Sequence, residues 1–264
     1  MLTPLIKRWL LFTVLIASLY VSPTIGYGAI FEDTFANQGF TVNNWMNTGG
    51  NWTFPADPPN TYRGTWDGLS FAAATLANSG KGYFQSNLSL QTTVALGYEN
   101  SAAGLWLTFD EQGNYVYQIS IISGFIQFGG QDKLVLSRVK DKNPLEFAIL
   151  NLDPPANGLS INTGTFYTIE AAIDDQNVLS VTLLDPGRLP GEQSIAALVW
   201  NLTNDPEFAA GVPNSVGAGI FAQDDATFDS FTLNGTPIPI PKTSWLLGFG
   251  ILCVLGVRKT LTPS

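Results

Sequence analysis

Histidine is absent from the 264 residues of this chain, and cysteine occurs only once, as Cys253. The absence of histidine excludes histidine-dependent catalytic triads, histidine general bases and the usual zinc sites. Because Cys253 lies in an apolar run near the C-terminus, the rest of the chain has neither a disulfide nor a thiol nucleophile.

Basic residues are also few: 12 lysines and arginines stand against 21 aspartates and glutamates, for a net charge of −9. Five of the basic residues lie in the terminal segments, which leaves seven basic and 21 acidic residues in the central part, a net charge near −14. Nucleic-acid binding needs clustered lysine and arginine to neutralise phosphates, so this balance argues against it. It favours a soluble surface or cation binding instead.

Residues 1–28 have the layout of a secretory signal peptide. Lys7 and Arg8 precede a thirteen-residue apolar run from Trp9 to Val21, and small residues follow at the spacing of a cleavage site. The pattern predicts Sec export and cleavage by signal peptidase after Gly28 or Ala29. The alternative is an uncleaved anchor helix, which the shortness of the run disfavours, since spanning a bilayer takes about 20 residues.

The C-terminal segment, residues 236–264, joins a proline-punctuated stretch to an apolar run and a basic end. Residues 243–257 are expected to form a transmembrane helix of about 22 Å, which is short for a hydrocarbon layer of about 30 Å. The prolines before it hold the chain extended, as a protease substrate requires. Positive residues after the run are expected to stay cytoplasmic, which places the central part outside.

This segment, "IPIPKTSWLLGFGILCVLGVRK", resembles the PEP-CTERM sorting signal of Gram-negative bacteria in its VPLPA-type variant. The matching positions are Ile238, Pro239, Ile240, Pro241, Trp245, Arg258 and Lys259. Lys242 departs from the small residue usual at its place. The resemblance implies recognition by an exosortase, removal of the helix, and delivery of the protein to the cell envelope or extracellular matrix. The alternative is a permanent C-terminal anchor.

Residues 30–235 alternate between apolar and polar side chains with period two, which predicts one antiparallel all-β domain, a sandwich or a barrel. The segments "GLWLTF" and "YVYQISII" flank the turn "DEQGN" and predict a hairpin. No helical periodicity of useful length is present. Long loops are expected at 43–63, 144–163 and 186–216, which are rich in proline, asparagine and glycine.

Four segments of this domain, "IFEDTF", "GLWLTFDEQGNYVYQISII", "FYTIEAAIDDQNVLSVTLLD" and "VGAGIFAQDDATFDSFTLNG", look like those of concanavalin A-like, laminin-G-type jelly rolls. The resemblance implies a two-sheet jelly-roll sandwich whose first and last strands pair. It also implies a glycan-binding role.

A candidate ligand surface lies on the less apolar face of successive strands. Its predicted members are Gln85, Asn87, Trp106, Gln118 and Gln127, with Ser89 on the same face. A tryptophan among amides suits sugar recognition, because the ring stacks on C–H faces while amides bond hydroxyl groups. The alternative is the ordinary solvated side of a sandwich. The other tryptophans of this domain are expected to anchor loops and core: Trp45, Trp52, Trp66 and Trp200.

A structural calcium site is a second hypothesis. Glu32 and Asp33 near the first strand and Asp229 in the last approach one another if those strands pair, and carboxylate oxygens are calcium ligands. Asp224 and Asp225 in the preceding turn are further candidates. The alternative is ordinary solvated acids.

Glycoside hydrolysis needs two carboxylates about 5 to 9.5 Å apart. The Glu-x-Asp-x-Glu motif of laminarinase-type jelly rolls is absent, and Glu170, Asp174 and Asp175 are expected at a strand end or turn. The sequence therefore predicts a non-catalytic, exported envelope or matrix protein that binds polysaccharide or serves adhesion. The alternatives are a glycan-cleaving enzyme with carboxylates assembled from loops, and a purely structural surface protein.

Overall fold

The computed structural model describes residues 29–66, 72–76, 88–108, 115–124, 130–140, 143–152, 160–211 and 217–235. The predicted signal peptide and sorting signal both lie outside these ranges. Within the ranges, no helix has the length and apolar character needed to cross a membrane.

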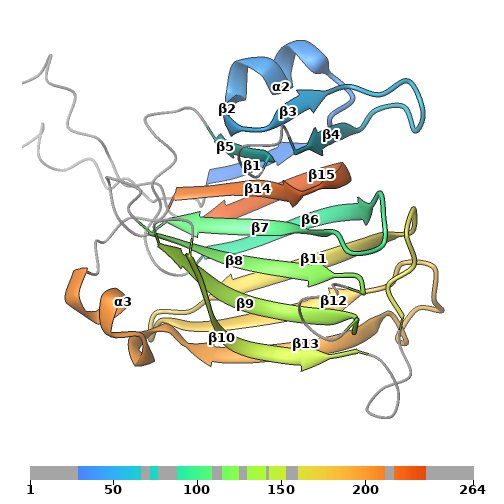
Figure 1. The fold of residues 1–264 in the computed structure, drawn as a ribbon. Helices are drawn as coiled ribbons and strands as arrows, with labels where there is room; N and C mark the ends of the chain where they lie inside the picture. Colours follow the sequence, from blue (N-terminus) through green and yellow to red (C-terminus); the bar gives the residue numbers. More distant parts are fainter. Residues whose placement is uncertain are drawn as a thin grey trace, which may run out of the picture.

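Two antiparallel sheets pack face to face (Figure 1), so the predicted two-sheet β-sandwich is confirmed. Sheet A has the order β13 (Ser194–Asn201), β12 (Val178–Leu184), β11 (Phe166–Ile173), β6 (Leu88–Leu96), β15 (Asp225–Gly235), β4 (Tyr62–Thr65) and β3 (Asn51–Thr53), and β1 (Ala29–Asp33) also pairs with β15. Sheet B has the order β10 (Asn143–Asn151), β9 (Lys133–Lys140), β8 (Tyr115–Ile122), β7 (Ala102–Thr108), β14 (Gly217–Gln223), β5 (Ala72–Leu76) and β2 (Trp45–Gly49).

Period-two alternation builds the core between the sheets. In β6 the side chains of Leu88, Leu90 and Val94 point inward, and in β8 those of Ile119 and Ile121 do the same from the opposite sheet. Each such side chain, when fully buried, stabilises the fold by about 1.5–3 kcal/mol. The main hydrophobic cluster takes side chains from both sheets, and a small second cluster consists of Ala102, Ile122 and Val135.

Two predicted pairings are confirmed. Strands β7 and β8 form the expected hairpin, with Leu107 opposite Tyr117. The first strand pairs with the last, with Asp33 opposite Phe231. Since β15 pairs with β6 along its other edge, this arrangement places β1 in the same sheet as β11 and β12.

The long loops predicted at 43–63, 144–163 and 186–216 are partly wrong, because they contain the strands β2, β3, β10 and β13. All four are edge strands of their sheets. An edge strand needs hydrogen bonds on one side only, so it tolerates proline, as at Pro144 in β10, and polar residues that suggest a loop.

Three short helical segments were not expected: α2 (Gln38–Asn44), η2 (Leu202–Asn204) and α3 (Pro206–Gly211). Helix α2 is capped at its N-terminus by Asn37, whose side chain accepts a hydrogen bond from the Phe40 amide at 3.1 Å. It lies with β2, β3 and β4 at one edge of the sandwich, and α3 lies at the opposite edge (Figure 1). Helices this short are stabilised by tertiary packing. They are too short to show a helical periodicity in the sequence.

The tryptophan predictions hold for three of four residues. Trp45 is buried in the core, and Trp52 and Trp200 pack against it. Trp66 is 53 % exposed at the end of β4, so its assignment as an anchor was wrong.

A buried polar cluster joins β8 and β9 to the segment between η2 and α3. Asp205 is fully buried and accepts hydrogen bonds from the Tyr117 hydroxyl and from Arg138 Nη1, the latter at 2.5 Å. The Arg138 guanidinium also lies 5.5 Å from the centroid of the Phe147 ring. The Asp205 carboxylate thus compensates the charge of Arg138, whose side chain points from sheet B into the interior.

Candidate functional site

The outward face of sheet A carries an open groove of about 320 Å³ across four strands. Its polar lining consists of Ser89 and Gln91 from β6, Glu170 from β11, Ser180 and Thr182 from β12, and Asn234 from β15. These residues alternate with inward-pointing core residues, so the pattern that builds the core also aligns the polar side chains on the opposite face.

Strand register places the groove residues in two rows. In the first, Glu170 stands opposite Gln91 on one side and Thr182 on the other, and Gln91 Nε2 donates to Glu170 Oε1 at 3.3 Å. In the second, Ala172 stands between Ser89 and Ser180. Because Ala172 has only one side-chain carbon, the second row is hollow, and the neighbouring polar groups remain accessible.

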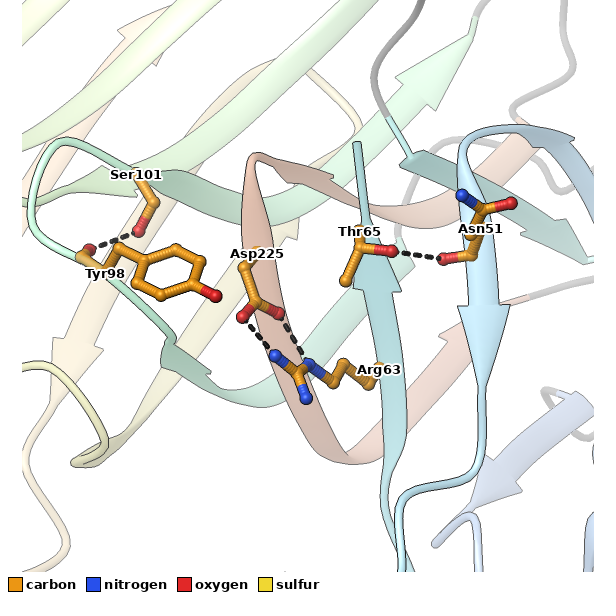
Figure 2. Close-up of polar contacts among 6 residues, drawn as sticks. All are labelled: Asn51, Arg63, Thr65, Tyr98, Ser101 and Asp225. Carbon is orange, nitrogen blue, oxygen red and sulfur yellow. Dashed lines mark hydrogen bonds and ion pairs between the residues drawn. The ribbon is translucent and has the colours of Figure 1, made fainter. Parts of the chain in front are cut away.

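The polar surface continues from the groove along β6 and its neighbours. The hydroxyl groups of Thr93 in β6 and Thr168 in β11 are hydrogen bonded at 2.9 Å. At the end of β6, Asp225 in β15 forms a two-pronged ion pair with Arg63 in β4, with Nε–Oδ1 at 2.8 Å and Nη2–Oδ2 at 2.5 Å (Figure 2). The hydrogen bonds to this carboxylate raise the pKa of the Arg63 guanidinium.

The loop after β6 borders this ion pair. Figure 2 shows the Tyr98 side chain directed with its hydroxyl group toward Asp225 and Arg63, and its ring is 59 % exposed. The Gly97 amide donates to the Asp225 carbonyl at 3.0 Å, and Ser101 Oγ donates to the Tyr98 carbonyl at 2.6 Å. A Cβ atom at Gly97 would overlap the Asp225 carboxylate, so glycine is needed where the two strands meet.

Three further carboxylates mark the charge of this face. Glu32 and Glu170 are exposed in one cross-strand row, with Thr232 and Gln91 between them. Three strand spacings separate these two carboxylates, about 14 Å. Asp229 is exposed at the bulge of β15, and partial burial raises the pKa of its carboxyl group.

The predicted ligand surface is divided between the two sheets. Trp106 and Gln118 are direct cross-strand neighbours on the outward face of sheet B, and Gly219 stands on the other side of Trp106. Ser89 belongs to sheet A, so the expectation of one shared face was wrong for β6. Gln85, Asn87 and Gln127 lie outside the described residues.

Little of sheet B is open to solvent around Trp106. Both Trp106 and Gln118 are half-buried, and Ser120 and Ser137, which also point outward, are buried. Phe221, in the strand next to Trp106, is only 3 % exposed. This surface therefore presents fewer accessible polar groups than the groove on sheet A.

The predicted calcium ligands are not gathered. Asp33 is buried and accepts hydrogen bonds from the Phe35 amide at 2.7 Å and from Trp45 Nε1 at 2.9 Å, so both its oxygens serve the core. Glu32 and Asp229 are exposed, whereas Asp33 points inward. Of the further candidates, Asp225 binds Arg63, and Asp224 is in a turn with φ +70°. No group of three or more potential metal-ligating side chains occurs in the described part of the chain.

Glu170 was the main residue that sequence reasoning misplaced. It lies inside β11 rather than at a strand end, while Asp174 does cap the following turn by accepting from the amides of Gln176 and Val178 at 2.9 and 2.8 Å. The outward polar positions of β11 and β12 were visible in the alternation. Their partnership with β6 was not, because it depends on pairing across 79 residues.

No protein-family model matches the sequence, and no curated protein matches it. Among solved structures, the fold is similar to a xylan β-1,4-xylosidase from Bacillus halodurans C-125, with a TM-score of 0.51 and 13 % identity over 77 % of this chain and 38 % of that one. It is also similar to a protein of unknown function with a galectin-like fold from Bacillus subtilis, with a TM-score of 0.51 and 12 % identity over 79 % of this chain and 97 % of that one.

These similarities show the fold alone, a jelly-roll β-sandwich of the galectin-like kind. The chain spans about two fifths of the xylosidase, so the match concerns only part of that enzyme.

Proposed function

We propose that this is an exported envelope or extracellular-matrix protein whose sandwich binds polysaccharide without cleaving it. The observation that carries the binding proposal is the open groove on sheet A, lined by hydroxyl, amide and carboxylate groups. Such groups are donors and acceptors that match sugar hydroxyl groups. The polar surface that runs on along β6 toward Tyr98 suits a chain of sugars better than a single ring.

The carboxylate geometry supports binding without catalysis. Among the described residues, Glu170 is the only acidic one that lines the groove, and Glu32, the next carboxylate along the row, is about 14 Å away. Glycosidases hold their two carboxylates about 5 to 9.5 Å apart. The described residues of this groove therefore lack the pair that glycan cleavage needs.

Export and sorting rest on the sequence pattern of residues 1–28 and 236–264. Exosortase recognition of the Ile238–Pro241 stretch, followed by removal of the helix, would place the sandwich at the envelope or in the matrix. A mass spectrum of the mature protein tests this directly. Peptides that contain Trp245 and Cys253 should be absent, and their presence would support a permanent anchor instead.

A glycan array tests the binding proposal. Wild-type protein should bind polysaccharide, and Ala172→Tyr, which fills the hollow row without changing the charge, should lose most of that binding. Ala56→Tyr, at an exposed position between β3 and β4, is the matched control and should bind normally. Absence of wild-type binding to any glycan would refute the proposal, and turnover of a bound polysaccharide would replace it with the enzymatic alternative.

A further inference from the structure

The groove on sheet A is negatively charged, and no described basic side chain compensates it. Glu170, the one ionisable residue among the described residues of its lining, has a neutral partner in the Gln91 amide. The two arginines described on this sheet and its hairpins are both paired with aspartates, Arg63 with Asp225 and Arg188 with Asp185 at 3.3 Å. A ligand in the groove therefore meets a carboxylate that has no positive neighbour.

The groups next to Glu170 are also acceptors that a protonated amine can use. Thr182, Glu170 and Gln91 stand side by side on three adjacent strands, with strand spacings of about 4.8 Å. Gln91 uses its Nε2 toward Glu170, which leaves its Oε1 as an acceptor. Glu170 thus has a neutral acceptor on either side, the Thr182 hydroxyl and the Gln91 amide oxygen, and a protonated amine bound to the carboxylate has further donors for one of them.

We propose that the groove selects a glycan that carries protonated amino groups, a hexosamine polymer with free rather than acetylated amines, and that Glu170 is the ion-pair partner. This inference rests on the proposed polysaccharide binding and names its substrate class. A uronic-acid polymer would be repelled by Glu170 and Glu32, both on this face. A neutral polymer would make hydrogen bonds to the carboxylate but no ion pair, so it would gain less from Glu170 than an amine-bearing polymer.

Calorimetric titration of the purified full chain tests the selectivity with three β-1,4-linked oligomers of equal length, one of glucosamine, one of N-acetylglucosamine and one of glucose. The glucosamine oligomer should bind about tenfold more tightly than the other two at low salt, and the advantage should shrink at high salt. Glu170→Gln keeps the side-chain shape and should bring the three affinities to within about twofold of one another.

Glu146→Gln, on β10 of the other sheet, removes the same charge far from the groove and should leave the selectivity unchanged. Thermal unfolding of both variants checks that the fold is intact. If Glu146→Gln weakens amine binding as much as Glu170→Gln does, general attraction to an acidic protein explains the preference, and the inference is overturned.

Equal binding of the amino and acetylated oligomers would also overturn the inference while leaving polysaccharide binding in place. If the protein bound none of the three oligomers and no glycan on an array, the proposed function itself would be refuted. The two failures are therefore distinguishable.

Discussion

The outward faces of the two sheets have the same alternation of side chains, but the surroundings of Ala172 on sheet A and of Trp106 on sheet B differ in accessibility. On sheet A, short polar residues such as Ser89 and Ser180 flank Ala172 and leave an open groove. On sheet B, Trp106 is half-buried among residues such as Ser120 and Phe221 that are almost closed to solvent. An outward polar position is accessible to a ligand only where its neighbours are small and uncovered.

The largest expected effect is on stability, and it comes from a substitution in the interior that both faces share. Asp205→Ala should lower the free energy of unfolding by about 3–5 kcal/mol, because it leaves the buried charge of Arg138 and the hydroxyl group of Tyr117 without their partner. Urea unfolding followed by fluorescence measures this. A loss below about 1 kcal/mol would show that water reaches Arg138 and that the cluster is not a buried one.

A smaller loss of stability is expected from a substitution in sheet B. A Cβ atom at Gly104 in β7 would overlap the carbonyl oxygen of Ile119 and approach Ile169 Cδ1 at 3.1 Å. Gly104→Ala should therefore cost about 1–3 kcal/mol of stability. Gly39→Ala in α2, where the nearest atom would be 3.5 Å away, is the control and should be neutral or stabilising. Equal effects of both substitutions in urea unfolding would contradict the steric argument.

Trp106→Ala tests directly which sheet binds glycan, because it removes the tryptophan of the predicted ligand surface, which lies on sheet B. Because the ring is half-buried, its removal should lower the free energy of unfolding by about 1–2 kcal/mol. Glycan binding measured at a temperature well below unfolding should be unchanged, since the groove is on the other sheet. Loss of binding by a folded variant would move the binding site to sheet B.

The smallest effect concerns charge on sheet A. Burial raises the pKa of Asp229 above its unfolded value, so ionisation of this group opposes folding once the pH exceeds the unfolded pKa. Asp229→Asn should stabilise the protein at about pH 7, by less than about 0.5 kcal/mol, and should have no effect at about pH 2.5, where both states are protonated.

Urea unfolding at the two pH values measures the difference for Asp229→Asn. Asp175→Asn, in the exposed turn after β11, is the control for loss of one negative charge. A stabilisation of Asp229→Asn that is larger at the lower pH would contradict the assigned cause.

Local pattern predicted much of the fold. The segments "YVYQISII" and "VLSVTLL" alternate between apolar and polar residues over 117–121 and 179–183, and they form β8 and β12. The pattern failed at the edges of both sheets, where β10 and β13 carry proline or polar residues that an interior strand would not accept. It also placed Asp33 in a calcium site, because nothing in the local sequence shows that Trp45 donates to this carboxylate from twelve residues away.

The sequence alone was enough to predict the all-β character of the domain, the inward and outward faces of its interior strands, the hairpin of β7 and β8, and the acidic character of the molecule. These follow from local periodicity and composition. Only the tertiary structure decided which strands share a sheet. It joined Gln91 to Glu170 across 79 residues and Arg63 to Asp225 across 162, and so placed the groove on sheet A and Trp106 on the opposite side of the sandwich. The reason is that alternation has a period of two residues, whereas sheet membership is set by hydrogen bonds between strands distant in the chain.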